Sequence, residues 1–304
     1  MRRNHWLFLG LPLFLISLLG GCAEVTKVGT MIGEQTGHLS RQDGESIRRV
    51  ADQTASAIRP MTEQEENYVG RAVAATLLGK YRICADARLN RYVNEVGQTV
   101  ALASDRPLTY GGYHFAVLDT EEVNALACPG GIIFITLGML NRTTNEEELA
   151  AVLSHEVAHV NHRDGLASIQ KSRWAQVVTT LGSEAARKYS GAELAKLLSL
   201  FEGSVNDVAA TLLVNGYGRE QERAADFSAL TFLTRIGYDP YGFTDCLGTL
   251  SREQAGGSRP GIFSTHPGMQ ERLTRARSTI AGNKWTRSDH SPRDQRFREM
   301  CGLR

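Results

Sequence analysis

Residues 155–159 read His-Glu-Val-Ala-His inside a mostly apolar, helix-favouring stretch, and this feature constrains the chain more than any other. In an α-helix, residues four apart lie on one face, about 6 Å apart along the axis, so both imidazoles can bind one Zn²⁺. Glu156 would then reach a metal-bound water and act as its general base. A charged side chain is costly to bury in an apolar helix without a partner, which favours a metal site over a chance match.

A zinc hydrolase usually has three protein ligands and one position for water. A third histidine six residues after His159, with a glycine midway, is excluded because Gly165 and His162 stand at those two positions. His162 shares the helix face, but it lies about 4.5 Å beyond His159 along the axis. We therefore interpret His162 as a polar residue near the helix end.

A carboxylate from a second helix is the better candidate for the third ligand. Over residues 219–235, one helical face carries Glu222, Ala225, Asp226, Ala229 and Leu233. The small residues would let this helix approach the first, so that Glu222 binds the metal and Asp226 accepts the free N–H of a ligating histidine. The alternatives are a solvated charged face, or another acid, Glu184 or Glu193, neither of which has an acid four residues later.

Several further segments occur in the order of a known family: Asn124–Gly131 (Asn-Ala-Leu-Ala-Cys-Pro-Gly-Gly), Thr136–Leu140, His155–His159, Glu222 with Ala225-Asp226, and Ser264–Pro267. Over roughly residues 60–280 the chain resembles the gluzincin metallopeptidases of the CAAX prenyl protease and HtpX type. Among these it is most similar to the periplasmic lipoproteins of the LoiP and BepA kind. The resemblance implies one Zn²⁺ per chain, held by His155, His159 and Glu222, with Glu156 as the base.

Two segments of alternating β-forming residues, 113–118 and 132–136, precede the histidine helix. They predict an α+β fold, a mostly helical zincin-type metallopeptidase domain with a small β-sheet over the active-site helix. In metallopeptidases of this type an edge strand binds the substrate backbone by strand addition. The expected substrate-binding residues are Gly130, Gly131, Ile132, Ile133 and Phe134, and the open alternative is an interior strand of the core.

His266 precedes Pro267, which restricts it to extended backbone and therefore to a loop. Three roles stay open for it. A neutral imidazole could occupy the open zinc position and hold the enzyme inactive, a protonated one could stabilise the oxyanion, or the residue could only cap the helix starting near Met269.

The first 22 residues have the pattern of an export signal. Two arginines precede an apolar run, Trp6 to Leu19, which is too short for a comfortable membrane span. Leu19-Gly20-Gly21-Cys22 resembles a bacterial lipobox, in which Cys22 is acylated, and more than one acyl chain gives stable anchoring. An inner-membrane retention signal would have Asp at the position of Ala23. We therefore expect the protein to lie at the periplasmic face of the outer membrane. The alternatives are an ordinary signal peptide or an uncleaved anchor.

Four cysteines follow Cys22, and an exported protein meets oxidising conditions. The even count predicts two disulfides among Cys84, Cys128, Cys246 and Cys301, with buried free thiols as the alternative. The charge balance, Lys+Arg 34 against Asp+Glu 33, leaves no basic excess for binding nucleic acid.

The expected domains are a signal peptide (1–21), a lipidated tether (22–60), the zinc metallopeptidase domain (61–282) and a tail (283–304). Residues 174–216 form a helical insertion whose charged residues leave no apolar run of membrane-spanning length. Together these features predict a lipid-anchored zinc endopeptidase, and the resemblance implies that it acts on misfolded envelope proteins. The rival hypotheses are a zinc-fold lipoprotein that assists assembly with little turnover, and a hydrolase of cell-wall peptide.

Overall fold

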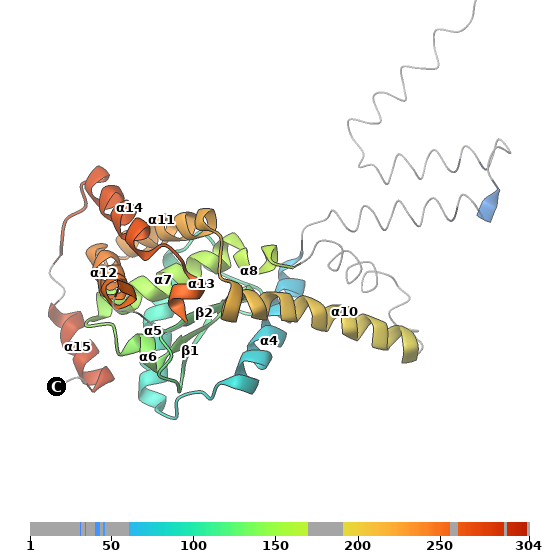
Figure 1. Ribbon diagram of the computed structural model, residues 1–304, viewed down its shortest axis with the longest axis horizontal. Helices are drawn as coiled ribbons and strands as arrows, with labels where there is room; N and C mark the ends of the chain where they lie inside the picture. The colour runs from blue at the N-terminus through green and yellow to red at the C-terminus, as the bar shows by residue number, and fades with distance from the viewer. Residues whose placement is uncertain are drawn as a thin grey trace, which may run out of the picture. The chain divides into compact units, whose positions relative to one another are not determined.

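The computed structural model describes residues 31, 34, 40–42, 45, 61–169, 191–255, 261–288 and 291–302 (Figure 1). The expected signal peptide, Cys22 and residues 174–190 of the expected insertion lie outside the described residues. The chain separates into two compact units, residues 1–60 with 170–203 and residues 61–169 with 204–304. All the expected metal ligands belong to the second unit. None of the described helices combines the length and the apolarity needed to cross a membrane.

The second unit has the α+β architecture that the sequence predicts, with many helices around one small sheet. Helices α4 (Glu63–Lys80) and α5 (Ala87–Ala103) come first. The strands β1 (His114–Leu118), β2 (Ala125–Cys128) and β3 (Ile132–Thr136) follow, with the short helix η1 (Pro129–Gly131) between the last two. The later elements are α6 (Leu137–Leu140), α7 (Glu146–His162), α8 (Asp164–Ala167), α10 (Gly191–Ala210, which begins in the first unit), η3 (Thr211–Asn215), α11 (Arg219–Arg235), α12 (Tyr241–Ala255), α13 (Ile262–Thr265), α14 (Met269–Gly282) and α15 (Ser291–Cys301).

The sheet has the strand order β1–β3–β2, so β3 is its central strand. Phe134 of β3 lies opposite Ala116 of the parallel strand β1 and opposite Leu126 of the antiparallel strand β2. The main chain of β3 is therefore paired on both sides, and β3 itself has no free edge for a substrate strand.

The prediction of a substrate-binding edge strand at Gly130, Gly131, Ile132, Ile133 and Phe134 is consequently wrong. The last three residues belong to the central strand. The two glycines belong to η1, where the Gly130 amide donates to the Glu66 carboxylate (3.2 Å) and its carbonyl accepts from the Thr109 hydroxyl (2.8 Å).

Helix α7 carries the His-Glu-Val-Ala-His sequence, and it packs against the sheet and against α5, α11 and α12 (Figure 1). It begins after Asn145, whose side chain accepts a hydrogen bond from the Glu148 amide (2.9 Å), and it ends at Arg163, whose backbone is left-handed (φ 59°). On α11, the fully buried Ala225 and Ala229 provide the small side chains that allow the two helices to approach closely.

The first turn of α7 is acidic and buried, and the charges of Glu146 and Glu147 are satisfied by distant parts of the chain. Glu146 accepts hydrogen bonds from the hydroxyls of Tyr92 and Tyr238 (both 2.8 Å) and from the Arg296 guanidinium of α15. Glu147 is paired with Arg293, which also lies on α15. Although burial alone would raise the pKa of Glu146, Arg296 and the two tyrosines lower it below its ordinary value of 4.5. Helix α15 is thus bound to the start of α7.

The four cysteines after Cys22 are free thiols, so the predicted pairing of Cys84, Cys128, Cys246 and Cys301 is wrong. Cys128 lies on β2 and Cys246 lies on α12, each buried in the core. Burial raises the pKa of both thiols, which behave as small apolar side chains.

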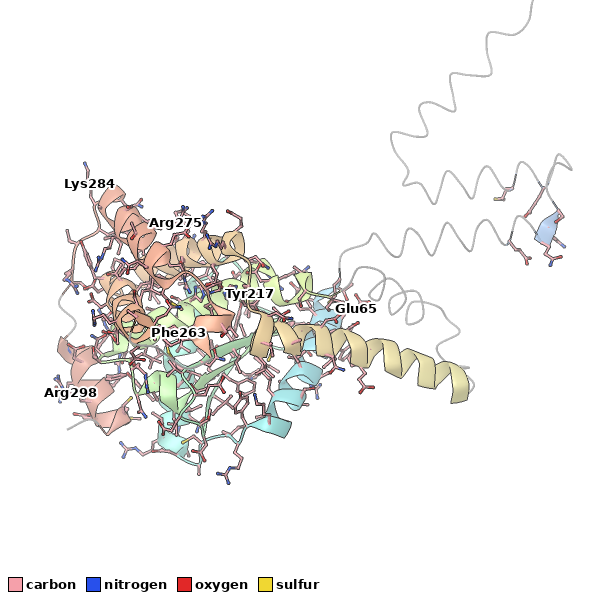
Figure 2. All side chains as sticks on the ribbon, in the orientation of Figure 1. Glu65, Tyr217, Phe263, Arg275, Lys284 and Arg298 are labelled. Carbon is pink, nitrogen blue, oxygen red and sulfur yellow. The ribbon has the colours of Figure 1, made fainter. Side chains whose placement is uncertain are left out.

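We predict that Arg296→Met lowers the free energy of unfolding by about 1–3 kcal/mol at pH 7, because buried Glu146 loses a charged hydrogen-bond donor. Urea unfolding followed by circular dichroism measures the change. Arg298→Met is the matched control, since Arg298 is an exposed arginine of the same helix that projects from its surface (Figure 2).

The pH dependence of this loss has a definite sign. The folded pKa of Glu146 is depressed, so its contribution to stability is present above pH 4.5 and disappears as the pH falls through the folded pKa. The difference between the wild type and Arg296→Met should therefore shrink as the solution is acidified. The pairing of Arg296 with Glu146 would be contradicted if the difference in free energy of unfolding stayed constant down to pH 3. Equal effects of Arg296→Met and Arg298→Met would contradict it as well.

Candidate metal centre

Four side chains from three separate segments converge beside α7. His155 and His159 come from α7, Glu222 comes from the first turn of α11, and His266 follows α13 directly. One ligand atom from each lies within 4.8 Å of all the others, and all four residues are buried. The fold thus brings His266 together with the three residues that were expected to bind the metal.

The separations between these atoms fit one tetrahedral zinc ion. The Nε2 atoms of His155 and His159 are 3.0 Å apart, and they lie 3.4 and 3.5 Å from the Glu222 carboxylate oxygens. The Nδ1 atom of His266 is 2.9 Å from Glu222 Oε1. Four ligand atoms placed tetrahedrally at zinc-ligand distances would be about 3.3 Å apart. The donor set, nitrogen with one carboxylate, is also the set that zinc prefers.

Carboxylates behind the two α7 histidines hold their Nε2 atoms toward the cluster. Asp226 Oδ1 lies 3.0 Å from His155 Nδ1, in the position that the sequence predicted. Asp164 Oδ2 lies 2.8 Å from His159 Nδ1, and this partner was not predicted. Although burial opposes its protonation, Asp164 and Glu222 raise the pKa of His159 to about 9. Two carboxylates thus fix the orientation of the two imidazoles, as such partners do at metal sites.

Arg272 of α14 is a second residue that the sequence analysis missed. Its buried guanidinium donates to both oxygens of Asp226 (2.9 and 2.7 Å) and lies 2.8 Å from Glu222 Oε2. Burial would raise the pKa of Glu222, but His266, when protonated, and Arg272 hold it well below its ordinary value. Burial lowers the pKa of His266, whereas a guanidinium stays charged, so Arg272 supplies a permanent positive charge beside the two carboxylates.

Glu156 stands apart from the ligand cluster. It is almost completely buried, and neither of its carboxylate oxygens has a hydrogen-bond partner among the described residues. The nitrogen Nε2 of His266 lies 3.7 Å from Glu156 Oε1, beyond hydrogen-bond range. An unsatisfied buried carboxylate is uncommon in a folded protein and calls for an explanation. One explanation is that Glu156 is a general base whose only hydrogen-bond donor would be a water molecule at the metal.

His266 is turned toward the cluster and does not cap α14. That helix begins after Gly268 and has no side-chain cap. The imidazole contacts Glu222, and its ring centroid lies 5.3 Å from that of His159 and 5.8 Å from that of Tyr217. The capping hypothesis is therefore excluded, and the two near-site hypotheses remain.

Tyr217 also lies beside the four clustered residues, in the interior of the second unit (Figure 2). Its ring stacks on His159 with centroids 4.1 Å apart, and its amide donates to the Thr265 carbonyl (3.0 Å). No spacing in the sequence pointed to it. His162 contacts the Ser228 hydroxyl (3.1 Å) and is not in the metal-ligand group, in agreement with its interpretation as a polar residue. The rival acids Glu184 and Glu193 have side chains outside the described residues.

The chain matches the model of peptidase family M48 over residues 87–280, which is more than half of its length. It is similar to the beta-barrel assembly-enhancing protease of Escherichia coli strain K12, with 24% identity over 253 residues that cover 83% of this chain and 51% of that protein. The chain thus spans about half the length of this relative.

Two shorter proteins of Escherichia coli strain K12 are also similar. Metalloprotease YcaL is 29% identical over 171 residues, which cover 56% of this chain and 63% of YcaL. Metalloprotease LoiP is 24% identical over 196 residues, which cover 64% of this chain and 71% of LoiP. The matched family segment contains both histidines of α7, Glu222, His266 and Arg272, and the chain therefore belongs to peptidase family M48.

Proposed function

We propose that this protein is a zinc-dependent endopeptidase of the bacterial envelope. The observation that carries the proposal is the buried, unsatisfied carboxylate of Glu156 beside the cluster of His155, His159, Glu222 and His266. His155, His159 and Glu222 would hold the zinc ion. This arrangement places a base next to a metal-binding centre, as peptide-bond hydrolysis requires.

Zinc, when bound, would supply Lewis-acid polarisation of the scissile carbonyl and of the attacking water. Glu156 accepts the proton of that water and delivers it to the leaving amine. Asp226 and Asp164 keep the imidazoles oriented, and Arg272 neutralises the carboxylates that would otherwise repel each other.

The substrate backbone has a better docking edge at β2 than at β3. β2 lies at the end of the sheet and packs on α7, and one of its edges has no strand partner among the described residues. Just before β2, the Val123 carbonyl accepts a hydrogen bond from the Ile262 amide (2.9 Å), so the start of this edge is occupied by the segment that carries His266. We place strand addition at this edge.

The proposed location is the periplasmic face of the outer membrane, with lipid on Cys22 and misfolded envelope proteins as substrates. The lipobox-like Leu19-Gly20-Gly21-Cys22 supports the anchor. The name of the beta-barrel assembly-enhancing protease supports an envelope role for that relative. An assembly factor with little turnover is the rival, and the presence of Glu156 with the ligand set favours turnover. Digestion of casein but not of muropeptides would separate a protease from a cell-wall hydrolase.

Two glutamate-to-glutamine changes should have different effects on zinc. Glu222→Gln should reduce the zinc content well below one ion per chain, since it removes an anionic ligand. Glu156→Gln should keep one zinc ion and lose activity by about 10²-fold or more, since it removes only the base. Metal analysis and casein digestion of both purified variants measure this. Full zinc in Glu222→Gln, or undiminished turnover in Glu156→Gln, would reverse the assignment.

We propose that His266 gates the metal, because its ring nitrogen already lies among the ligand atoms. His266→Ala should then raise the basal kcat of the zinc-loaded enzyme. A fall of about 10²-fold or more would instead identify His266 as an oxyanion donor. Unchanged kinetics would exclude both roles.

Lipidation predicts that the mature protein begins at acylated Cys22. Mass spectrometry of the N-terminal peptide from membrane fractions should find the mass of the acyl chains on this residue. Cys22→Ser should release the protein from the membrane fraction, while Cys84→Ser, the control, should not. An unmodified Cys22 would contradict the proposed lipid anchor.

A further inference from the structure

Tyr217 is a buried residue beside the candidate metal centre, and the chemistry proposed above gives it no part. It stands between η3 and α11, two residues before the helix that carries Glu222 (Figure 2). Its ring stacks on His159 with centroids 4.1 Å apart, and its amide donates to the Thr265 carbonyl (3.0 Å). Contacts of both its side chain and its main chain therefore fix the place of the phenol.

The hydroxyl of Tyr217 is buried and has no hydrogen-bond partner among the described residues. Other buried tyrosines of the same unit differ in this respect, because the hydroxyls of Tyr92, Tyr113 and Tyr238 donate to oxygens 2.8–3.1 Å away. A phenylalanine would stack on His159 equally well, without the free-energy cost of burying an unsatisfied hydroxyl. The phenol oxygen of Tyr217 therefore calls for an explanation other than packing.

The carboxylate of Glu156 is the complementary group. Within the described part of the chain its two oxygens also have no hydrogen-bond partner, and an ionised carboxylate can only accept. Burial first, and the charge of Glu156 second, raise the pKa of Tyr217 well above its ordinary value of 10.0, so the hydroxyl keeps its proton. The two groups are thus close enough to interact, yet they make no direct hydrogen bond with each other.

His266 lies near both unsatisfied groups. Its Nε2 atom is 3.7 Å from Glu156 Oε1, and its ring centroid is 5.8 Å from that of Tyr217. If the imidazole leaves the ligand cluster, as the proposed gating requires, water can enter the space that it vacates. One water molecule there can donate a hydrogen bond to the carboxylate and accept one from the phenol, which would satisfy both groups.

We propose that Tyr217 is a further catalytic residue, whose hydroxyl donates a hydrogen bond to the attacking water while Glu156 accepts the proton of that water. Once the proton has moved to Glu156, the water oxygen has three lone pairs. One of them accepts from the phenol, and another forms the bond to the scissile carbon. The proton then passes to the leaving amine as the C–N bond breaks. This inference rests on the proposed peptidase function and adds a second residue that positions the nucleophile.

The variant Tyr217→Phe removes the hydroxyl and keeps the ring that stacks on His159. In the zinc-loaded protein, its kcat for a synthetic peptide should fall about 10²-fold, since misplacing a reacting group costs about this factor. KM and the zinc content should stay at the wild-type values. The melting temperature of the metal-free protein should not fall, because the hydroxyl has no partner to lose among the described residues.

Tyr92→Phe is the matched control, because it makes the same chemical change at a buried tyrosine away from the ligand cluster. The Tyr92 hydroxyl donates to Glu146 (2.8 Å), so this variant should lower the melting temperature and keep the wild-type kcat. A wild-type kcat in Tyr217→Phe would overturn the proposal. A melting temperature lowered as in Tyr92→Phe, or a loss of zinc, would make the role of the hydroxyl structural and would overturn it as well.

A phosphinic peptide provides a measurement that needs no turnover. Its tetrahedral phosphorus carries oxygens where the attacked carbonyl carries its own oxygen and that of the water, so it resembles the transition state. Calorimetric titration of the zinc-loaded proteins should give a Kd about 10-fold higher for Tyr217→Phe than for the wild type or Tyr92→Phe, the loss expected for one hydrogen bond to a charged group. An uncleaved substrate peptide should bind Glu156→Gln equally well with and without Tyr217→Phe.

The outcomes separate this inference from the proposed function. Cleavage by the wild type and equal cleavage by Tyr217→Phe would retain the peptidase and reject the role of the phenol. A wild type that cuts no peptide, but binds the phosphinic peptide more tightly than Tyr217→Phe does, would retain the hydrogen bond from Tyr217 and reject the peptidase. No cleavage and no difference in affinity would reject both.

Discussion

The close approach of α7 and α11 is the constraint on which the candidate centre depends. Ala225 and Ala229 have no exposed surface, and their small side chains let the backbone of α11 lie close to α7. Only at that separation does the short side chain of Glu222 reach the imidazoles of His155 and His159. A larger side chain at either alanine would push the helices apart. Glu222 would then no longer reach the histidines, although none of the three ligand residues had been changed.

Burying so many charges at once requires compensation both at the candidate metal centre and at the start of α7. At the centre of the site, Arg272 pairs with Glu222 and Asp226. At the N-terminus, Arg293 and Arg296 of α15 pair with Glu147 and Glu146. A buried ion pair does not necessarily add stability, but the loss of one partner leaves a charge that the interior cannot solvate. Arg272 therefore binds α14 to α11, and Arg293 and Arg296 bind α15 to α7.

How much the sequence predicts depends on whether a contact follows from helix geometry or from tertiary packing. His155, His159, Glu222 and Asp226 were found because residues three or four apart share a helix face. Asp164 lies after α7 has ended at the left-handed Arg163, where helical spacing no longer applies. Arg272 belongs to a third helix whose position only packing determines. Short apolar segments do not show which strand is central, and for that reason β3 was mistaken for an edge.

The cysteines were misjudged for a related reason. Export and an even count make disulfides chemically reasonable, but a disulfide also needs Cα atoms within about 7 Å. Neither the count nor the compartment carries information about distance. Cys128 and Cys246 are instead used as core residues of β2 and α12.

The pairing of Arg296 with Glu146 joins residues that are 150 positions apart in the chain. During synthesis, a chain that extends only as far as α14 has Glu146 and Glu147 without either guanidinium. The start of the histidine-bearing helix is then an acidic turn that favours water over the core. Both guanidinium partners of this turn come from the last helix that the structure describes, so the packing of the ligand helix depends on residues near the end of the sequence.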